Sequence, residues 1–164
     1  MAVLEVLQYP DPRLKQVSVP VTVFDAGLRV FLADLEATMR AGPGSVGITA
    51  PQVNQFIRIA LVDVSSKPNI PQHGCLRLIN PEIVLRAGEV KGREGCMSVP
   101  DFTGTVLRAQ SLHVRHQDAD GQWHEFDCEG YEARAVQHEI DHLDGLLFLD
   151  RVVSTRHDLF RRKL

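Results

Sequence analysis

QHEIDH, residues 137–142, places two histidines four positions apart, with a glutamate directly after the first. Residues four apart on an α-helix lie on one face, one turn apart, because 3.6 residues complete a turn. On a helix, His138 and His142 could therefore hold one cation between their imidazoles, while Glu139 reaches a water molecule on that cation. The apolar periodicity around the motif predicts such a helix over residues 131–143.

The apolar neighbours of this motif distinguish a packed helix from a surface one. Val136, Ile140 and Leu143 give the predicted helix an apolar face of its own. The alternative is a surface helix with two exposed histidines, and these three residues argue against it. We therefore expect this helix at the centre of the fold, with antiparallel β-sheets packed around it.

The rest of the chain predicts an α+β fold. An apolar stripe after Asp25, the expected N-cap, predicts an N-terminal helix that stops at Gly42. Short β-branched or alternating stretches predict strands at 57–64, 76–85, 112–118 and 122–128, the last two joined by an Asp120-Gly121 hairpin turn. Residues 154–164 predict a short basic helix at the C-terminus.

The composition is typical of a globular chain. Its 164 residues are 44% hydrophobic and 24% charged, which excludes a mainly disordered protein and favours one domain over 1–164. A net charge of −3 argues against binding to nucleic acid or to anionic membranes. With three cysteines, no signal-like N-terminus and no long apolar stretch, we expect a reduced, cytoplasmic and monomeric protein.

Two histidines leave a metal site incomplete, because a catalytic ion usually takes three protein ligands and keeps one position for water. No HExxHxxGxxH spacing follows His142 to supply the third ligand. Cys96 offers one, in the polar segment EGCMS at residues 94–98, which suits a turn or strand end. Cys75 and Cys128 lack comparable surroundings, and we expect them to be small, partly buried thiols.

Residues 47–52, GITAPQ, form a third segment that follows the end of the first predicted helix. Gly47 would let the backbone approach a ligand closely. Gln52 offers a neutral amide donor that could polarise a carbonyl oxygen. Alone, this segment would be interpreted as a structural loop.

Together the three segments resemble the motifs GxGLAAPQ, EGCLS and QHExDH of the peptide deformylases, which remove the N-terminal formyl group from new polypeptides. The chain has SVGITAPQ at 45–52, EGCMS at 94–98 and QHEIDH at 137–142, in the same order. The resemblance continues through VLEVLQYPDPRLKQVSVPV at 3–21, LINPEI at 78–83 and HLDGLLFLDR at 142–151. It therefore spans nearly the whole chain.

The resemblance implies a metal centre. Cys96, His138 and His142 would hold one divalent ion, with water in the fourth position, and Glu139 would be the general base. The family points to Fe²⁺, although Ni²⁺, Co²⁺ or Zn²⁺ can take the same imidazole and thiolate donors.

The resemblance also implies how the substrate, an N-formylmethionyl peptide, would be bound. Gln52 and the backbone N–H of Met97 would form the oxyanion hole, where a single donor is worth about 2.7–4 kcal/mol. The implied substrate-binding residues are Val46, Gly47, Glu94 and Gly95.

Some residues depart from the family motifs. Ser45 replaces a glycine, and Ile48, Thr49 and Met97 replace Leu, Ala and Leu. Arg134, one turn before His138, is similar to the organellar, mitochondrial-type branch. It would be either a salt-bridged structural residue or part of an altered pocket for the first side chain of the substrate.

Two supporting contacts can be expected near the site. Glu94 would pair with Arg108 and fix the strand that presents Cys96. Asp141 would either orient a ligand imidazole or serve as a solvated or capping residue.

Alternatives to deformylation remain open at this point. The HExxH motif would also serve an amidase or peptidase with a different substrate. The altered first motif would also fit a catalytically altered or non-catalytic homologue. The basic residues Arg161, Arg162 and Lys163 would allow a transient contact with the ribosome.

Overall fold

The computed structural model describes residues 2–162, in which two α-helices and two antiparallel sheets form an α+β fold, as predicted. The helices and strands, in chain order, are η1 (Pro12–Lys15), α1 (Ala26–Ala41), β1 (Gly47–Thr49), η2 (Pro51–Val53), β2 (Ile59–Val62), β3 (Leu76–Ala87), β4 (Val90–Cys96), β5 (Val99–Arg108), β6 (Ser111–Gln117), β7 (Trp123–Glu129), α2 (Gly130–Leu143), η3 (Phe148–Arg151) and β8 (Leu159–Arg161). The strand order is β1-β2-β3-β6-β7 in one sheet and β4-β5-β8 in the other.

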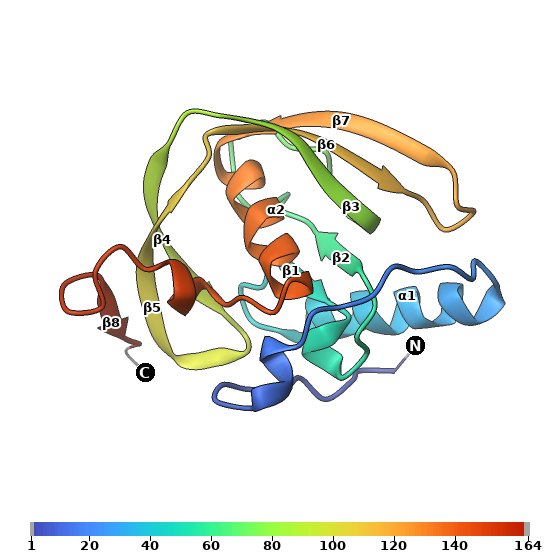
Figure 1. Cartoon of the computed structure of the whole chain (residues 1–164), viewed down its shortest axis with the longest axis horizontal. Coiled ribbons are helices and arrows are strands. Elements are labelled where there is room, and N and C mark those ends of the chain that lie inside the picture. The colour runs from blue at the N-terminus through green and yellow to red at the C-terminus, as the bar shows by residue number, and fades with distance from the viewer. Residues whose placement is uncertain (1, 163–164) are drawn as a thin grey trace.

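Strand β2 lies between the two helices. Because side chains alternate along a strand, Ile59 and Leu61 join the core formed with α1, while Ala60 and Val62 join the core formed with α2. All four side chains are fully buried, because both faces of the strand are covered, and its sequence is accordingly apolar at every position. The sheet thereby holds α1 and α2 on its opposite faces (Figure 1).

Helix α1 follows the sequence prediction closely. Asp25 is its N-cap, and its side chain accepts a hydrogen bond of 2.9 Å from the backbone N–H of Leu28. The apolar stripe is buried against the sheet through Leu28, Leu32, Leu35 and Met39. The opposite face of the helix is largely exposed, as an amphipathic pattern predicts.

Helix α2, which carries the HExxH motif, lies between the two sheets (Figure 1). It spans Gly130–Leu143, within one residue of the predicted range, and almost its whole circumference is buried. The chain turns away at Gly145, whose φ of +77° favours glycine and whose Cα packs against the carbonyl of Lys15. The predicted central position of this helix is confirmed.

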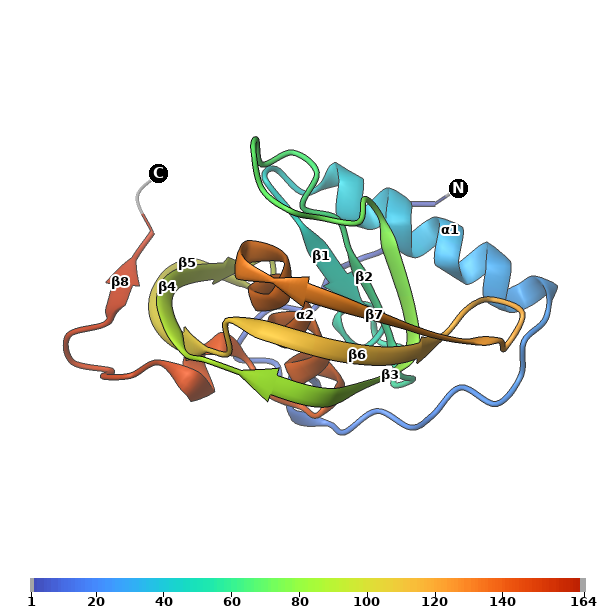
Figure 2. The same cartoon turned by 90° about the horizontal axis from the view of Figure 1, so that it is seen from above.

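The three-stranded sheet covers the other side of the α2 region. Val99 and Val106 of β5 pack with Leu147 and Phe148, just after α2, in a separate core. Strand β8 extends this sheet at the end of the molecule opposite α1 (Figure 2). Strand β4 is the other edge strand of this sheet, and its Glu94 contacts His138 of α2.

The short C-terminal helix expected over 154–164 is wrong within the described residues. Residues 154–158 form turns and Leu159–Arg161 form β8, while residues 163–164 lie outside the described range. Strand pairing with β5 satisfies this backbone, and Phe160 is covered by the guanidinium of Arg93 at 3.8 Å from the ring centre. A helix of this length has little stability by itself in water, so these tertiary contacts determine the conformation of the segment.

Among residues 2–162, neither α-helix has the length and apolar content needed to cross a bilayer.

Candidate active site

Three of the four residues predicted around the metal centre bring sulfur and nitrogen atoms together. Cys96 ends β4, while His138 and His142 lie one turn apart on α2. One donor atom from each residue lies within 4.8 Å of the other two, and Cys96 Sγ is 3.4 Å from His142 Nε2. Residues more than 40 positions apart in the chain thus form one candidate site.

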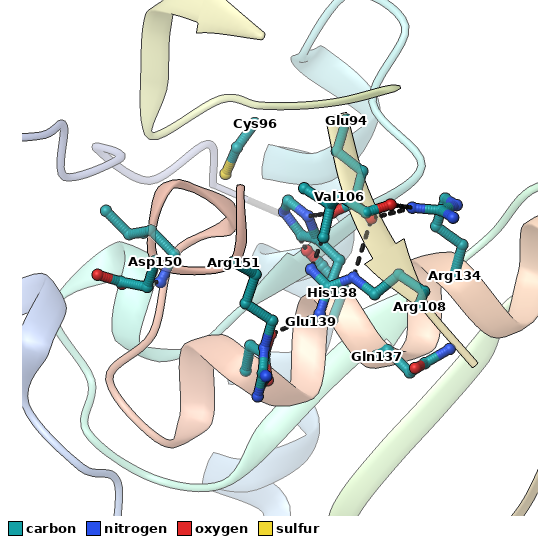
Figure 3. A network of polar contacts seen from close by, with 12 residues as sticks. Glu94, Cys96, Val106, Arg108, Arg134, Gln137, His138, Glu139, Asp150 and Arg151 are labelled. Carbon is teal, nitrogen blue, oxygen red and sulfur yellow. Dashed lines mark hydrogen bonds and ion pairs between the residues drawn. The ribbon is translucent and has the colours of Figure 1, made fainter. Parts of the chain in front are cut away.

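Glu94 orients one of these imidazoles. Its Oε1 lies 2.8 Å from His138 Nδ1, as Figure 3 shows. A carboxylate at Nδ1 favours the tautomer with its proton there, which leaves the lone pair of Nε2 for a metal ion. Glu94 lines the cavity, as expected of a substrate-binding residue, but its carboxylate is turned towards this histidine and two arginines.

The carboxylate of Glu94 accepts hydrogen bonds from two buried guanidinium groups (Figure 3). Arg108 donates through Nε at 2.9 Å and Nη2 at 2.8 Å, which confirms the predicted pair. Arg134 donates through Nη1 at 2.7 Å. Burial alone would raise the pKa of Glu94, but the hydrogen bonds from Arg108 and His138 outweigh it and hold the pKa well below its usual range.

Asp141 takes neither the imidazole-orienting role nor a solvated position. Its carboxylate accepts from Arg108 Nη1 at 2.6 Å and from Arg151 Nε at 2.6 Å. Sequence spacing did not indicate this, because Arg108 lies 33 positions away and joins Asp141 to Glu94. Glu94, not Asp141, contacts a ligand histidine.

The donor set fits a divalent transition-metal ion. One thiol sulfur and two imidazoles are donors suited to Fe²⁺, Ni²⁺, Co²⁺ or Zn²⁺. Cys96 is half-buried and both histidines are buried, and Cys96 and His138 line a cavity. The Glu94 contact with His138 supplies the outer partner that metal-binding histidines commonly have.

Glu139 is placed as a proton acceptor should be. It is buried, its Oε2 has no hydrogen-bond partner among the described residues, and it lines the same cavity as Cys96 and His138. Burial raises the pKa of Glu139 to about 7. Gly47 leaves room for this side chain, because a Cβ there would lie only 2.8 Å from the Glu139 carboxyl carbon.

Gln52 is buried beside the cysteine, held by polar contacts at both ends of its amide. Its Oε1 accepts from the backbone N–H of Thr49 at 3.0 Å and from the Thr49 hydroxyl at 3.1 Å. Its Nε2 donates to the Ser98 hydroxyl at 3.0 Å and lies 3.6 Å from Cys96 Sγ. The hydroxyl of Thr49, a departure from the family motif, therefore adds a contact that orients this amide.

The cavity beside these residues has a volume of about 630 Å³. The loop at 42–47 forms one wall, and residues 93–97 together with α2 form others. The four residues expected to bind substrate all line it, namely Val46, Gly47, Glu94 and Gly95. Since β1 and β4 are edge strands of their sheets, two free strand edges lie beside the cavity.

The comparison with protein-family models decides the family. The model of the polypeptide deformylases matches residues 3–158 of the chain. This chain belongs to the peptide deformylase family. Members of this family are hydrolases that act on the N-terminal formyl group, and the family implies a divalent metal ion.

Individual peptide deformylases agree with this assignment. That of Acidobacterium capsulatum is 42% identical over 164 residues, which cover 100% of this chain and 95% of the relative. The crystal structure from Thermotoga maritima has a TM-score of 0.86 and 34% identity, covering 94% of this chain and 100% of that one. The class I type b enzyme from Acinetobacter baumannii, in a structure with Met-Ala-Ser bound, has a TM-score of 0.85 and 35% identity over 92% of this chain and 99% of that one.

Arg134 has a structural role in this peptide deformylase. Besides Glu94, its guanidinium donates to the carbonyl oxygens of Val106 at 3.1 Å and Val90 at 2.6 Å. It packs on Gly92, where a Cβ would lie 2.8 Å from the guanidinium carbon. The salt-bridged interpretation is thus confirmed. Arg134 also lines the cavity, but its part in a pocket for the first substrate side chain stays a prediction.

The other two cysteines stand apart from this centre. Cys75 is exposed, not partly buried as expected, and lies 3.6 Å from a Glu36 carboxylate oxygen. Cys128 is buried in the core that α2 shares with the five-stranded sheet. Among the residues the structure describes, Cys96 is the cysteine in the group that could hold a metal ion.

Proposed function

We propose that this chain removes the formyl group from N-formylmethionyl peptides, using a divalent metal ion held by Cys96, His138 and His142. The observation that carries the proposal is the convergence of these three donors within 4.8 Å, beside a cavity lined by Cys96, His138 and Glu139. The three-donor set leaves room for water and for the carbonyl oxygen of a substrate. We further propose that residues 1–164 form a single catalytic domain.

Glu139 is the general base of the proposed reaction. A divalent ion in this site supplies Lewis acidity and lowers the pKa of water to about 7. Glu139 takes the proton of the attacking water and passes it to the leaving amine. Its unpartnered Oε2 and its pKa of about 7 support both transfers at neutral pH.

Gln52 and the backbone N–H of Met97 stabilise the negative charge that develops on the formyl oxygen. The side-chain amide of Gln52 has two N–H groups, one donating to the Ser98 hydroxyl and the other directed at Cys96 Sγ, 3.6 Å from Nε2 at the metal-donor cluster. Thr49 fixes the carbonyl end of the same amide, so the second N–H keeps its direction during the reaction. A preoriented donor of this kind is worth about 2.7–4 kcal/mol.

The peptide lies between the free edges of β1 and β4, where Val46, Gly47, Glu94 and Gly95 line the cavity. An extended chain can hydrogen-bond with strand edges through its own backbone. The Acinetobacter baumannii relative has Met-Ala-Ser bound in its crystal structure, which supports a methionine-first peptide here. Within this picture Glu94 acts through His138, while its backbone borders the peptide.

We propose Fe²⁺ as the ion of this site. A cysteine thiolate and two imidazoles suit several divalent ions, and the family resemblance points to Fe²⁺ among them. Such a site is oxygen-sensitive, since both the ion and Cys96 can be oxidised. Metal analysis of anaerobically purified protein tests this choice. The cytoplasmic location, the monomeric state and a transient ribosome contact stay predictions.

Formate release from a formyl-Met tripeptide tests the function directly. We expect metal-loaded protein to release formate, and the Glu139→Gln variant to lose about 10²–10⁴-fold in kcat while keeping its metal. Hydrolysis of an unformylated amide, with the formylated peptide left intact, would instead favour an amidase or peptidase. Absence of hydrolysis in fully metal-loaded wild type would favour the non-catalytic alternative.

A further inference from the structure

The chain after β8 brings an arginine to the rim of the cavity. The backbone N–H of Arg162 donates to the carbonyl of Asp101 at 2.7 Å, which fixes where the residue leaves the sheet. Its side chain lies over Gly95, because a Cβ on this glycine would be 2.6 Å from Arg162 Nη2. Both residues line the cavity that Cys96, His138 and Glu139 also line.

Arg93 lies on the same rim. It is exposed on β4, two residues before Gly95, and its guanidinium covers the Phe160 ring at 3.8 Å from the ring centre. Phe160 belongs to β8, so this contact joins β4 to the strand that Arg162 directly follows. The two guanidinium groups thus come from opposite edges of the three-stranded sheet, and both line the cavity.

These two arginines differ from Arg134, the other arginine of the cavity. Arg134 is buried and ion-paired with Glu94. Within residues 2–162, no carboxylate lies within ion-pair distance of Arg93 or Arg162. The rim therefore carries positive charge that the described part of the chain leaves uncompensated.

The acidic groups of the cavity do not cancel this charge. Glu94 is already paired with Arg108 and Arg134, and Glu139 lies buried beside Gly47. A substrate held along the edge of β4 would pass Gly95, and hence the guanidinium that rests on it. The part of the peptide that follows the formyl-methionine would meet this rim.

We propose that Arg162 and Arg93 form an anion-accepting subsite, which selects formyl peptides that carry a carboxylate after the formyl-methionine. The proposal deepens the proposed function and depends on it for the direction of the peptide. Guanidinium groups suit this role because they present planar, paired donors to a carboxylate. The carboxylate can come from an Asp or Glu side chain or from the C-terminus of a short peptide.

The test compares kcat/KM for C-terminally amidated formyl-Met-Ala-Glu, formyl-Met-Ala-Gln and formyl-Met-Ala-Lys. We expect the wild type to prefer the Glu over the Lys peptide about three- to tenfold, because each exposed charge pair contributes modestly. Ionic strength near 1 M should remove the preference, since screening is then strong over about 3 Å. Formyl-Met-Ala-Ser as free acid and as amide shows whether a C-terminal carboxylate serves as well.

Variants of the rim separate a specific subsite from a general effect. Arg162→Ala should bring the Glu/Lys ratio close to one and Arg162→Glu should invert it, while Arg93→Ala should lower it. Arg161→Ala, at the last residue of β8 and outside the cavity lining, is the control with the same charge change and should keep the wild-type ratio. If the variants changed kcat/KM equally for all three peptides, the proposal would be overturned, because Arg162 and Arg93 would then only support or cover the cavity.

A binding measurement keeps this test independent of turnover. The dissociation constants of amidated Met-Ala-Glu and Met-Ala-Lys, measured calorimetrically on metal-loaded protein, should show the same preference and the same loss in Arg162→Ala. Selective binding without formate release would uphold the subsite and count against the proposed function. Formate release with no charge selectivity in either assay would uphold the function and overturn the subsite.

Discussion

Helices α1 and α2 pack on opposite faces of the same strand, yet they bury different chemistry. Helix α1 buries mainly Leu28, Leu32, Leu35 and Met39 and leaves its other face largely exposed. Helix α2 buries twelve of its fourteen residues, several of them charged or polar. Helix α1 is therefore held mainly by apolar packing, with Thr38 as its one buried polar residue, whereas α2 needs partners for several buried charged groups.

The difference lies in how buried charge is compensated. An isolated buried ion is costly, and it persists where oppositely charged or hydrogen-bonding groups surround it. In α2, Arg134 and His138 meet Glu94, and Asp141 meets Arg108 and Arg151, all from other elements. Glu139 is the exception, because its buried Oε2 has no hydrogen-bond partner among the described residues. Within α2, Glu139 thus differs from Arg134, His138 and Asp141, whose charged groups have hydrogen-bonded partners of opposite charge.

The largest expected effect removes a metal ligand. In Cys96→Ser the softer thiolate donor is replaced by a hydroxyl, which binds transition metals weakly at neutral pH. We expect formate release to fall at least about 10⁴-fold and the bound metal to be lost on dialysis. Metal content by mass spectrometry and far-UV circular dichroism check this. Retained metal and activity would show that the sulfur is not a ligand.

The second-largest effect should come from breaking the buried ion pairs of α2. Glu94→Gln keeps the side-chain shape but removes the charge that Arg108, Arg134 and His138 share. We expect the free energy of unfolding to drop by about 4 kcal/mol, because buried guanidinium groups lose their counter-ion. Metal affinity should fall about 10–100-fold.

Urea unfolding and a metal-competition titration measure the two effects of Glu94→Gln. The matched control is Glu82→Gln, which neutralises an exposed carboxylate paired with Arg115. That change should alter stability by less than about 1 kcal/mol. If Glu94→Gln and Glu82→Gln lowered the free energy of unfolding equally, the buried ion pairs of Glu94 would contribute no more to stability than a surface pair.

An apolar deletion in α1 gives the opposite pattern. Leu32 is fully buried between α1 and the sheet, so Leu32→Ala should lower the free energy of unfolding by about 3 kcal/mol. Metal affinity and kcat should stay as in wild type wherever the protein is folded. The comparison between the helices would fail if kcat fell in proportion to stability.

The smallest expected effect concerns the start of α1. Asp25→Ala removes the side-chain hydrogen bond to the N–H of Leu28 and should destabilise the protein by about 1 kcal/mol. Thermal melting should show a decrease of about 2–4 °C. The Asp25→Ser variant retains a capping oxygen and should recover most of the loss. A melting temperature unchanged in Asp25→Ala would show that packing alone defines this end.

The sequence predicted both helices, and it named the three residues whose donor atoms lie within 4.8 Å of one another. Helical periodicity and Asp25 defined α1, and the spacing of His138 and His142 defined the working face of α2. Cys96 came from its motif, as did Gln52 and Glu139. These residues were predictable because their positions follow local geometry or a specific motif.

The strands of the smaller sheet were harder to predict. Strand β4 (Val90–Cys96) contains two glycines and alternates poorly, so its local pattern does not indicate a strand. Its conformation depends on pairing with β5 and on the contacts of Glu94. The roles of Arg134 and Asp141 were equally hidden, because their partners lie 40 and 33 positions away.

The conformation of the C-terminal segment also depended on contacts far away in the sequence. Its basic composition was compatible with a helix, but β5 offers Leu159–Arg161 a strand partner. That partner also places Arg162 beside Gly95, a juxtaposition that no spacing along the chain indicates. Long-range pairing, not local propensity, determined what these residues do.

The contacts of Glu94 and Cys96 also join β4 to α2, two elements that belong to separate packed layers. Any opening motion that parts these layers must break the ion pairs of Glu94 and separate Cys96 from the two imidazoles. Amide hydrogen exchange in β4 and β5 therefore reports on the integrity of the site, and bound metal should slow it. A peptide-resolved exchange experiment could thus follow metal loading in the resting protein, with no substrate present.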